Sequence, residues 1–304
     1  MPSPPYDITL AAPAKLNLAL SVGGPDATGY HPLASWMVAL DFGDTVTLQR
    51  TEGATSFDIA YASDAPLHAN ESIDWPLEAD LAHQAYQAVE RAVGRTLPVW
   101  ATIRKRIPPG MGLGGGSSDA AAMLVGLAHL FALELSAERL RAIAATLGSD
   151  VPFLVSAFLQ HQPAGIVTGV GEEVALMPLE HSLHLVLILP ALHCPTAAVY
   201  QAFDKWHPDA GSAQHALVTS LAQTGTAEAG SLFNALGPPA LMVEPALAEL
   251  RERIADVVDR PVLITGSGGG LFVLARDENE ARDLARRIGE ATGVAALPAR
   301  DRQR

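Results

Sequence analysis

Cysteine is nearly absent from this chain, in which Cys194 is the single thiol among 304 residues. One cysteine cannot form an internal disulfide, so the sequence suits a reducing compartment. His193 stands beside it, but two such residues alone make neither a metal site nor a nucleophilic centre. We expect the Cys194 side chain to be a small buried apolar group.

Basic residues are scarce as well, with 20 lysines and arginines against 33 acidic residues and a formal net charge of −13. The densest short basic run before the tail is Arg104, Lys105 and Arg106. We therefore expect no nucleic-acid partner and no binding to an anionic membrane. An anionic substrate would have to be bound by a few local cations or by backbone N–H groups.

Apolar runs long enough to cross a bilayer are also missing. The run at residues 183–192 is too short, and the alanine-rich stretch at 120–135 is interrupted by His129 and Glu134. The first residues contain neither the basic region nor the apolar core of a secretory signal. These features predict a cytoplasmic protein, either a monomer or a homodimer.

Glycine, by contrast, is concentrated at residues 107–122, Ile-Pro-Pro-Gly-Met-Gly-Leu-Gly-Gly-Gly-Ser-Ser-Asp-Ala-Ala-Ala. Here a glycine-dense turn leads directly into a helix-forming alanine run. Glycines at 110, 112, 114, 115 and 116 can adopt positive φ and bring backbone N–H groups close to an anion. The first turn of the helix adds free N–H donors and a positive dipole end, and Ser117 or Ser118 can cap it or contact a phosphate. The segment predicts a phosphate site.

Glycine-rich segments of this kind have three other interpretations. A glycine-rich turn before a helix can be a mere tight connection. A Walker loop requires a lysine after the glycines, and none follows here. Gly110, Gly112 and Gly115 have the spacing of a dinucleotide fingerprint, but more than a hundred residues precede them, and the position 20 residues on is the apolar Leu135 rather than an acid.

Apolar periodicity predicts a mixed α+β protein with two domains, because strands and helices alternate without a strict βαβ rhythm. At 304 residues and 49% hydrophobic content the chain can form two cores. We place the domains at residues 1–165 and 166–304. Leu16, Leu18, Leu20 and Val22 alternate with small or polar residues and predict a strand whose leucines share one face, away from Lys15 and Asn17.

Further elements follow from the same patterns. Strands are expected at 45–49, 99–103, 183–189, 262–265 and 271–274, and helices at 80–94, 117–133, 136–147, 245–257 and 280–288. Residues 51–78 suggest an irregular loop or hairpin, and residues 208–230 suggest a mobile connection or weak helix.

Three segments, in this order, resemble the motifs of the GHMP kinases, which are ATP-dependent kinases of small molecules. They are Pro-Ala-Lys-Leu-Asn-Leu-Ala-Leu at 13–20, the glycine loop, and Thr-Gly-Ser-Gly-Gly-Gly-Leu-Phe at 265–272. Gly-Tyr-His at 29–31, Gly-Ser-Asp-Val-Pro at 148–152 and Gly-Val-Gly-Glu at 169–172 are similar to the members that phosphorylate a cytidine-diphosphate-linked methylerythritol. The resemblance covers nearly the whole chain and implies a two-domain fold with the active site in the cleft between the domains.

The resemblance implies a catalytic role for two residues. Asp150 would orient or deprotonate the 2-hydroxyl of the methylerythritol unit, and Lys15 would keep Asp150 ionised and offset charge on the transferred phosphoryl group. Outside this family context, Asp150 is more typical of a cap ahead of Pro152, and Lys15 of a solvated lysine at a strand end.

The remaining site residues fall into two groups. The ATP site would include a lysine before the loop and the loop itself, namely Lys105, Pro109, Gly110, Gly112, Leu113, Gly114, Gly115, Gly116, Ser117 and Ser118. The substrate site would hold the cytosine between aromatic rings and within reach of an imidazole, through Asn17, Tyr30, His31, Thr196, Tyr200, Gly266, Ser267 and Gly268. Mg²⁺ is required to offset the charge of ATP, but no acidic pair identifies its ligands, which remain unknown.

Several positions depart from the family pattern. An insertion-like Ala27-Thr28 precedes Gly-Tyr-His, the usual Asn-Asp-Leu reads Asn234-Ala-Leu236, and the usual Asn-Leu at the adenine-side helix reads Asp80-Leu81. The alternatives are a GHMP kinase of homoserine or mevalonate type, a GHMP-fold protein that binds ligand without catalysis, and a dinucleotide-dependent oxidoreductase. Retention of Lys15 and Asp150 argues against a GHMP-fold protein that lacks catalysis.

Overall fold

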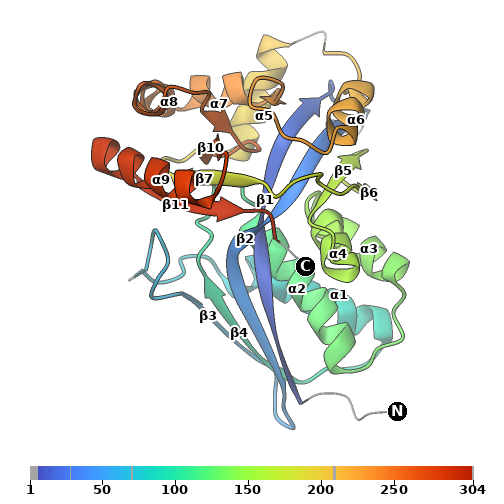
Figure 1. Ribbon diagram of the computed structural model, residues 1–304. Helices are drawn as coiled ribbons and strands as arrows, with labels where there is room; N and C mark the ends of the chain where they lie inside the picture. Colours follow the sequence, from blue (N-terminus) through green and yellow to red (C-terminus); the bar gives the residue numbers. More distant parts are fainter. Residues whose placement is uncertain (1–5, 28, 70, 208–209, 303–304) are drawn as a thin grey trace.

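Two long strands form the spine of the molecule. In the computed structural model, which describes residues 6–27, 29–69, 71–207 and 210–302, strand β1 spans Asp7–Val22 and strand β2 spans Leu33–Arg50. They pair antiparallel over their whole length, from Asp7 opposite Gln49 to Val22 opposite Leu33. Figure 1 shows them running through both halves of the protein.

The first sheet is built on this hairpin in the order β3-β4-β2-β1-β8, with β5 added on β2 and β6 on β5. Its further strands are β3 (Ser56–Tyr61), β4 (Val99–Lys105), β5 (Ala164–Thr168), β6 (Glu173–Leu176) and β8 (Phe233–Asn234). Helix α2 (Gly115–Leu130) packs on β1 and β2, with α1 (Leu81–Val93), α3 (Ala137–Ala145) and α4 (Val151–Gln160) around it. A short 3₁₀ turn, η1, covers Leu77–Ala79.

The second sheet has the order β11-β7-β10-β9. Its strands are β7 (His184–Leu189), β9 (Leu263–Ile264), β10 (Leu271–Ala275) and β11 (Ala295–Arg300). The same half of the chain contains helices α5 (Thr196–Trp206), α7 (Gly237–Val243), α8 (Pro245–Val258) and α9 (Glu278–Thr292), whereas α6 (His215–Gln223) packs on β1, β2 and β5 of the first sheet. Because β5, β6 and β8 pair into the first sheet, that sheet draws on chain beyond residue 165. The domain division at residues 165 and 166 stays a prediction.

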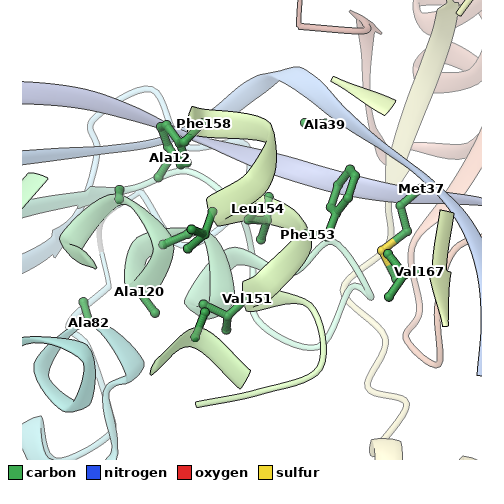
Figure 2. Close-up of a cluster of buried hydrophobic side chains, with 14 of the residues drawn as sticks. Ala12, Met37, Ala39, Ala82, Ala120, Val151, Phe153, Leu154, Phe158 and Val167 are labelled. Atoms are coloured by element: carbon green, nitrogen blue, oxygen red, sulfur yellow. The ribbon is translucent and has the colours of Figure 1, made fainter. Parts of the chain in front are cut away.

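Helix α4 packs beside α2, against α3 and strands β5 and β6, and contributes to the largest hydrophobic core. Val151, Phe153, Leu154 and Phe158 of this helix are all at least nine-tenths buried. Figure 2 shows Phe153 near Met37 of β2 and Val167 of β5, while Val151 lies on the side of Ala120. The burial of such side chains contributes about 1.5–3 kcal/mol each. This core therefore fixes where α4 begins, and Asp150 immediately precedes that point.

The first strand corrects one expectation, because its four apolar residues do not share a face. Leu16 and Leu18 pack in one core cluster, whereas Leu20 and Val22 pack in the other. The β1–β2 register shifts between Asn17 and Ala19, and such a bulge moves the following side chains to the opposite face. Lys15 and Asn17 do lie on one side, as predicted, with Lys15 Nζ 2.7 Å from Asn17 Oδ1.

Other elements were predicted with mixed success. The strands that contain residues 45–49 and 99–103, the strand at 183–189 and the helices at 80–94 and 245–257 are confirmed within a few residues. Residues 51–78 contain β3, an edge strand that was not expected, and residues 208–230 contain helix α6. Helix α4 was missed because Pro152 resembles a break, although proline is well accommodated in the first turn of a helix.

Two expectations about membranes and cysteine can be compared with the described residues. Within them, no helix combines the length and apolar character that a membrane crossing requires. Cys194 is 1% exposed and packs in the larger core, as predicted, and burial raises the pKa of its thiol. The thiol therefore stays protonated at neutral pH.

Candidate active site

Almost every residue of the predicted site lines one cavity of about 1150 Å³. It is lined by loops from both halves of the chain, among them the glycine loop at 109–117, the Tyr30–His31 turn and the second glycine turn at 266–268. Ser118 is the exception, since its side chain is fully buried and its hydroxyl has no partner, whereas Ser117 does line the cavity. Neighbouring residues of a helix point in different directions, and only Ser117 faces inward.

The glycine loop at 109–117 has a conformation in which backbone N–H groups can surround an anion, and we call this loop the cradle. Gly110, Gly112 and Gly114 have φ of 76°, 69° and 67°, a region that costs glycine little. Gly114 is the N-cap of α2, so the helix begins at Gly115, and Gly115 and Gly116 are helical rather than at positive φ as expected. The free N–H groups of the first turn and the positive end of the helix dipole therefore lie at the cavity wall.

The second glycine turn is packed directly against the first. A Cβ atom at Gly268 would lie 2.2 Å from Gly112 N and 2.4 Å from Gly110 O, and a Cβ atom at Gly112 would lie 2.2 Å from Thr265 O. Gly269 N also donates to Gly110 O at 3.1 Å. The backbones of the two turns touch without room for a side chain, so the second turn braces the cradle from behind.

Lys15 and Asp150 meet beside this loop. Lys15 Nζ lies 3.3 Å from Asp150 Oδ2, and the side chains are 5% and 25% exposed. The backbone N–H of Lys15 donates to Leu113 O at 2.9 Å, and a Cβ atom at Gly114 would lie 3.5 Å from Asp150 Oδ2. Asp150 occupies the N-cap position of α4 but accepts no capping bond there, which leaves its carboxylate available to the cavity.

A buried hydrogen-bond network holds Asn17 next to Lys15. Asn17 Nδ2 donates to Ser35 Oγ at 2.8 Å, and Asn17 N donates to Thr265 Oγ1 at 3.0 Å. Asn234 Nδ2 in turn donates to Ile264 O and Gly266 O, so the departure to alanine at the next position leaves this anchor intact. Ser35 was not predicted as part of the site, because a serine inside an apolar strand has no distinctive pattern.

Aromatic residues gather at one end of the cavity. The rings of His31 and Tyr200 lie 5.0 Å apart, and Tyr30 is 67% exposed at the rim. His31 Nδ1 lies 2.9 Å from Gly23 O, to which it must donate, and Nε2 lies 3.5 Å from Asp204 Oδ1. Burial raises the pKa of Tyr200, the negative charge of Asp150 adds a smaller effect in the same direction, and together they bring it to about 12. The departure at Ala27-Thr28 includes Thr28, which lies outside the described residues.

Lys105 lies beneath the glycine loop rather than free in the cavity. Its ammonium is bonded to both Asp44 and Asp119, two acids that the sequence analysis did not identify. Burial disfavours the charged ammonium, but Asp119 and Asp44 outweigh it and raise the pKa of Lys105. A lysine neutralised in this way is poorly placed to attract phosphate directly.

Trp75, Asp80 and Leu81 line the other end of the cavity. Asp80 accepts from Ala82 N at 2.9 Å and from Trp75 Nε1 at 3.0 Å, so it caps α1 and fixes the indole. Aspartate therefore serves as the cap at the position where the family has asparagine. Among the residues that the structure describes, no cluster of three or more His, Cys, Asp or Glu side chains could hold a metal ion.

Comparison with known proteins matches this architecture. The model of the GHMP kinase N-terminal domain matches residues 80–158. The 4-diphosphocytidyl-2-C-methyl-D-erythritol kinase of Caulobacter vibrioides (strain NA1000 / CB15N) is 38% identical over 284 residues, which cover 91% of this chain and 93% of the relative. That of Citrifermentans bemidjiense is 33% identical and spans 96% of this chain and 98% of the relative. This chain belongs to the 4-diphosphocytidyl-2-C-methyl-D-erythritol kinase family.

A solved structure places the fold in the same family. A crystal structure of a 4-(cytidine 5'-diphospho)-2C-methyl-D-erythritol kinase superposes with a TM-score of 0.74 at 30% identity and covers 96% of this chain and 98% of that one. A homoserine kinase from Cytophaga hutchinsonii, at 16% identity and a TM-score of 0.69, shares the fold alone. The α+β fold is confirmed, and the chain is a phosphotransferase of the GHMP kinase type.

Proposed function

We propose that this kinase transfers the γ-phosphoryl group of ATP to the 2-hydroxyl of 4-diphosphocytidyl-2-C-methyl-D-erythritol, a step in non-mevalonate isoprenoid biosynthesis. The observation that supports it most is the Lys15–Asp150 pair at 3.3 Å, which lies beside the glycine cradle in the same cavity. The names of the relatives supply the substrate, and the aromatic end of the cavity suits a pyrimidine.

The chemistry assigns one task to each residue of the pair. The substrate hydroxyl oxygen attacks the γ-phosphorus, its proton passes to the Asp150 carboxylate, and the bond to the ADP oxygen breaks. Lys15 offsets negative charge on the transferred group and is itself held by Asn17. In a loose phosphoryl-transfer transition state, such positioning and charge stabilisation matter more than base strength.

The ligands have one orientation that uses the whole cavity. The loop and the start of α2 bind the phosphates. The adenine then lies toward Trp75 and Leu81. Leu81 is close to the start of α2, because a Cβ atom added at Gly116 would lie 3.5 Å from it. The cytidine end lies toward Tyr30, His31 and Tyr200 on the other side of Asp150. Thr196 bonds Ser267 at 3.0 Å and would position the second glycine turn at the diphosphate.

Mg²⁺ is expected to accompany ATP and to offset the charge of its phosphates. The Ser117 hydroxyl and the Asp150 carboxylate are among the oxygen groups that line the cavity, and such groups suit a hard cation. We propose further that the enzyme acts in the cytoplasm, as a monomer or homodimer, without nucleic-acid or membrane partners. Its net charge of −13 supports the last point.

A coupled ADP-release assay with a panel of alcohols tests the substrate assignment. We expect turnover with the cytidine-diphosphate-linked methylerythritol, and none with homoserine or mevalonate. ADP release with one of the latter alone would move the chain to another branch of the GHMP kinases. ATP binding without ADP release on any alcohol would favour a non-catalytic ligand-binding protein.

The exposed ring of Tyr30 offers a selective test of the cytidine end. We expect Tyr30→Ala to raise the KM of the cytidine substrate about fivefold to hundredfold, because one aromatic stack on a base contributes about 1–3 kcal/mol. The KM of ATP should change less than about twofold. Tyr6, which is 63% exposed and does not line the cavity, provides the matched control as Tyr6→Ala. Equal effects on both substrates would contradict the stacking role.

A further inference from the structure

Three charged side chains are buried together beneath the glycine loop. Asp44 comes from β2, Lys105 from the end of β4 and Asp119 from the first turns of α2, and their side chains are 0%, 5% and 2% exposed. Lys105 Nζ bonds both carboxylates. Charges so deeply buried are costly unless they are fully paired, so their position calls for a functional explanation.

The two carboxylates differ in what else they bind. Asp44 Oδ1 accepts from the backbone N–H of Arg106 and, at 2.8 Å, from that of Ile107. Asp119 Oδ1 has no hydrogen-bond partner. Burial raises the pKa of Asp119 well above its usual value, and the pull of Lys105 in the other direction does not offset this. Asp44 is therefore the carboxylate with both oxygens bonded, whereas Asp119 has one oxygen without a partner.

Asp44 is thus the point at which the loop is attached to the sheet. The two backbone N–H groups that donate to it belong to Arg106 and Ile107, which directly precede Pro108 and the glycines. Two of the three partners of Asp44 also lie next to the start of α2, since a Cβ atom at Gly115 would lie 3.0 Å from Ile107 Cβ and 3.5 Å from Lys105 Nζ. A displacement at Asp44 would reach the first helical N–H groups through these contacts.

We propose that Asp44 is a positioning residue for the nucleotide, which fixes the entry of the phosphate loop through Arg106, Ile107 and Lys105 without touching the ligand. This inference rests on the proposed use of ATP. Asp44 is absent from the lining of the cavity, whereas its partners Lys105 and Ile107 belong to it, so its effect on nucleotide binding must pass through these partners and the loop that follows them. The substrate end, at Tyr30 and Tyr200, has no contact with this cluster.

The test compares Asp44→Ala and Asp44→Asn with the wild-type protein. Binding of ATP with Mg²⁺ is measured by titration calorimetry, and the KM of each substrate by ADP release. We expect Asp44→Ala to weaken nucleotide binding at least about tenfold, because small misplacements of a positioning group are amplified. Asp44→Asn retains one acceptor oxygen and should weaken binding about threefold or more. The KM of the alcohol should stay within about twofold in both.

Asp58→Ala is the matched control, since Asp58 forms an exposed ion pair with Arg104 on the neighbouring strand. It should bind the nucleotide like the wild type. The inference is overturned if Asp44→Ala binds ATP within about twofold of the wild type, or if the constants for both substrates rise by the same factor. Should Asp44→Ala fail to fold, the same two criteria apply to Asp44→Asn. Failure of the wild type to bind ATP would instead refute the proposed function.

Discussion

Replacement of Asp150 by asparagine is expected to lower kcat by about three orders of magnitude while both substrates still bind. Asparagine has nearly the same shape but cannot accept the hydroxyl proton, and loss of such a group typically costs 10²–10⁴-fold. The structure adds a reason for intact binding. The side chain of Asp150 makes no capping hydrogen bond to α4, so its replacement by asparagine removes no such bond from the helix.

Single-turnover ADP release and nucleotide titration would measure the two effects separately. Asp277→Asn is a suitable control, because Asp277 is the N-cap of α9 and accepts from Glu280 N at 2.9 Å. Asparagine is an equally good cap, so this variant should keep the activity of the wild type. If Asp150→Asn turned over at a near wild-type rate, Asp150 would have no part in the reaction.

Gly268→Ala is expected to abolish nucleotide binding almost completely. The added methyl group would stand 2.2 Å from Gly112 N and 2.5 Å from Met111 C, and both are backbone atoms that cannot rotate away. The phosphate loop must then shift bodily, which misplaces its N–H groups. Overpacking of this kind also lowers the free energy of unfolding, by about 1–3 kcal/mol.

Calorimetric titration with ATP and a thermal melt would record both consequences. Gly230→Ala is the matched control, because a Cβ atom at Gly230 would meet nothing within 4 Å. That variant should bind ATP and melt like the wild type. Unchanged nucleotide affinity in Gly268→Ala would mean that the second turn does not support the cradle.

The sequence predicted local features of the site well. The glycine run before an alanine-rich segment did become a loop with positive φ and a helix, because both tendencies are properties of adjacent residues. Lys15 and Asn17 share a side because their spacing of two matches the strand repeat. Pairing of Lys15 with Asp150 came from the family resemblance, since periodicity carries no information about contacts between distant segments.

Other parts of the site could not be foreseen. The bulge after Asn17 depends on how β1 and β2 pair, and it sends Leu20 and Val22 into a different core from Leu16. Asp44 follows a glycine at mid-strand and has no pattern that distinguishes it from a surface residue. Its importance arises only where β2, the end of β4 and α2 come together.

The contact between the two glycine turns also has a bearing on biosynthesis of the chain. The segment that carries the family signature ends at residue 158, but the turn that braces its loop lies at 265–270, close to the carboxyl terminus. A nascent chain that has emerged only to the middle of α8 possesses every glycine of the first turn but lacks the second turn that packs against it. The two turns can therefore meet only after residues 265–270 have been synthesised, and an excised segment of residues 80–158 would lack this support.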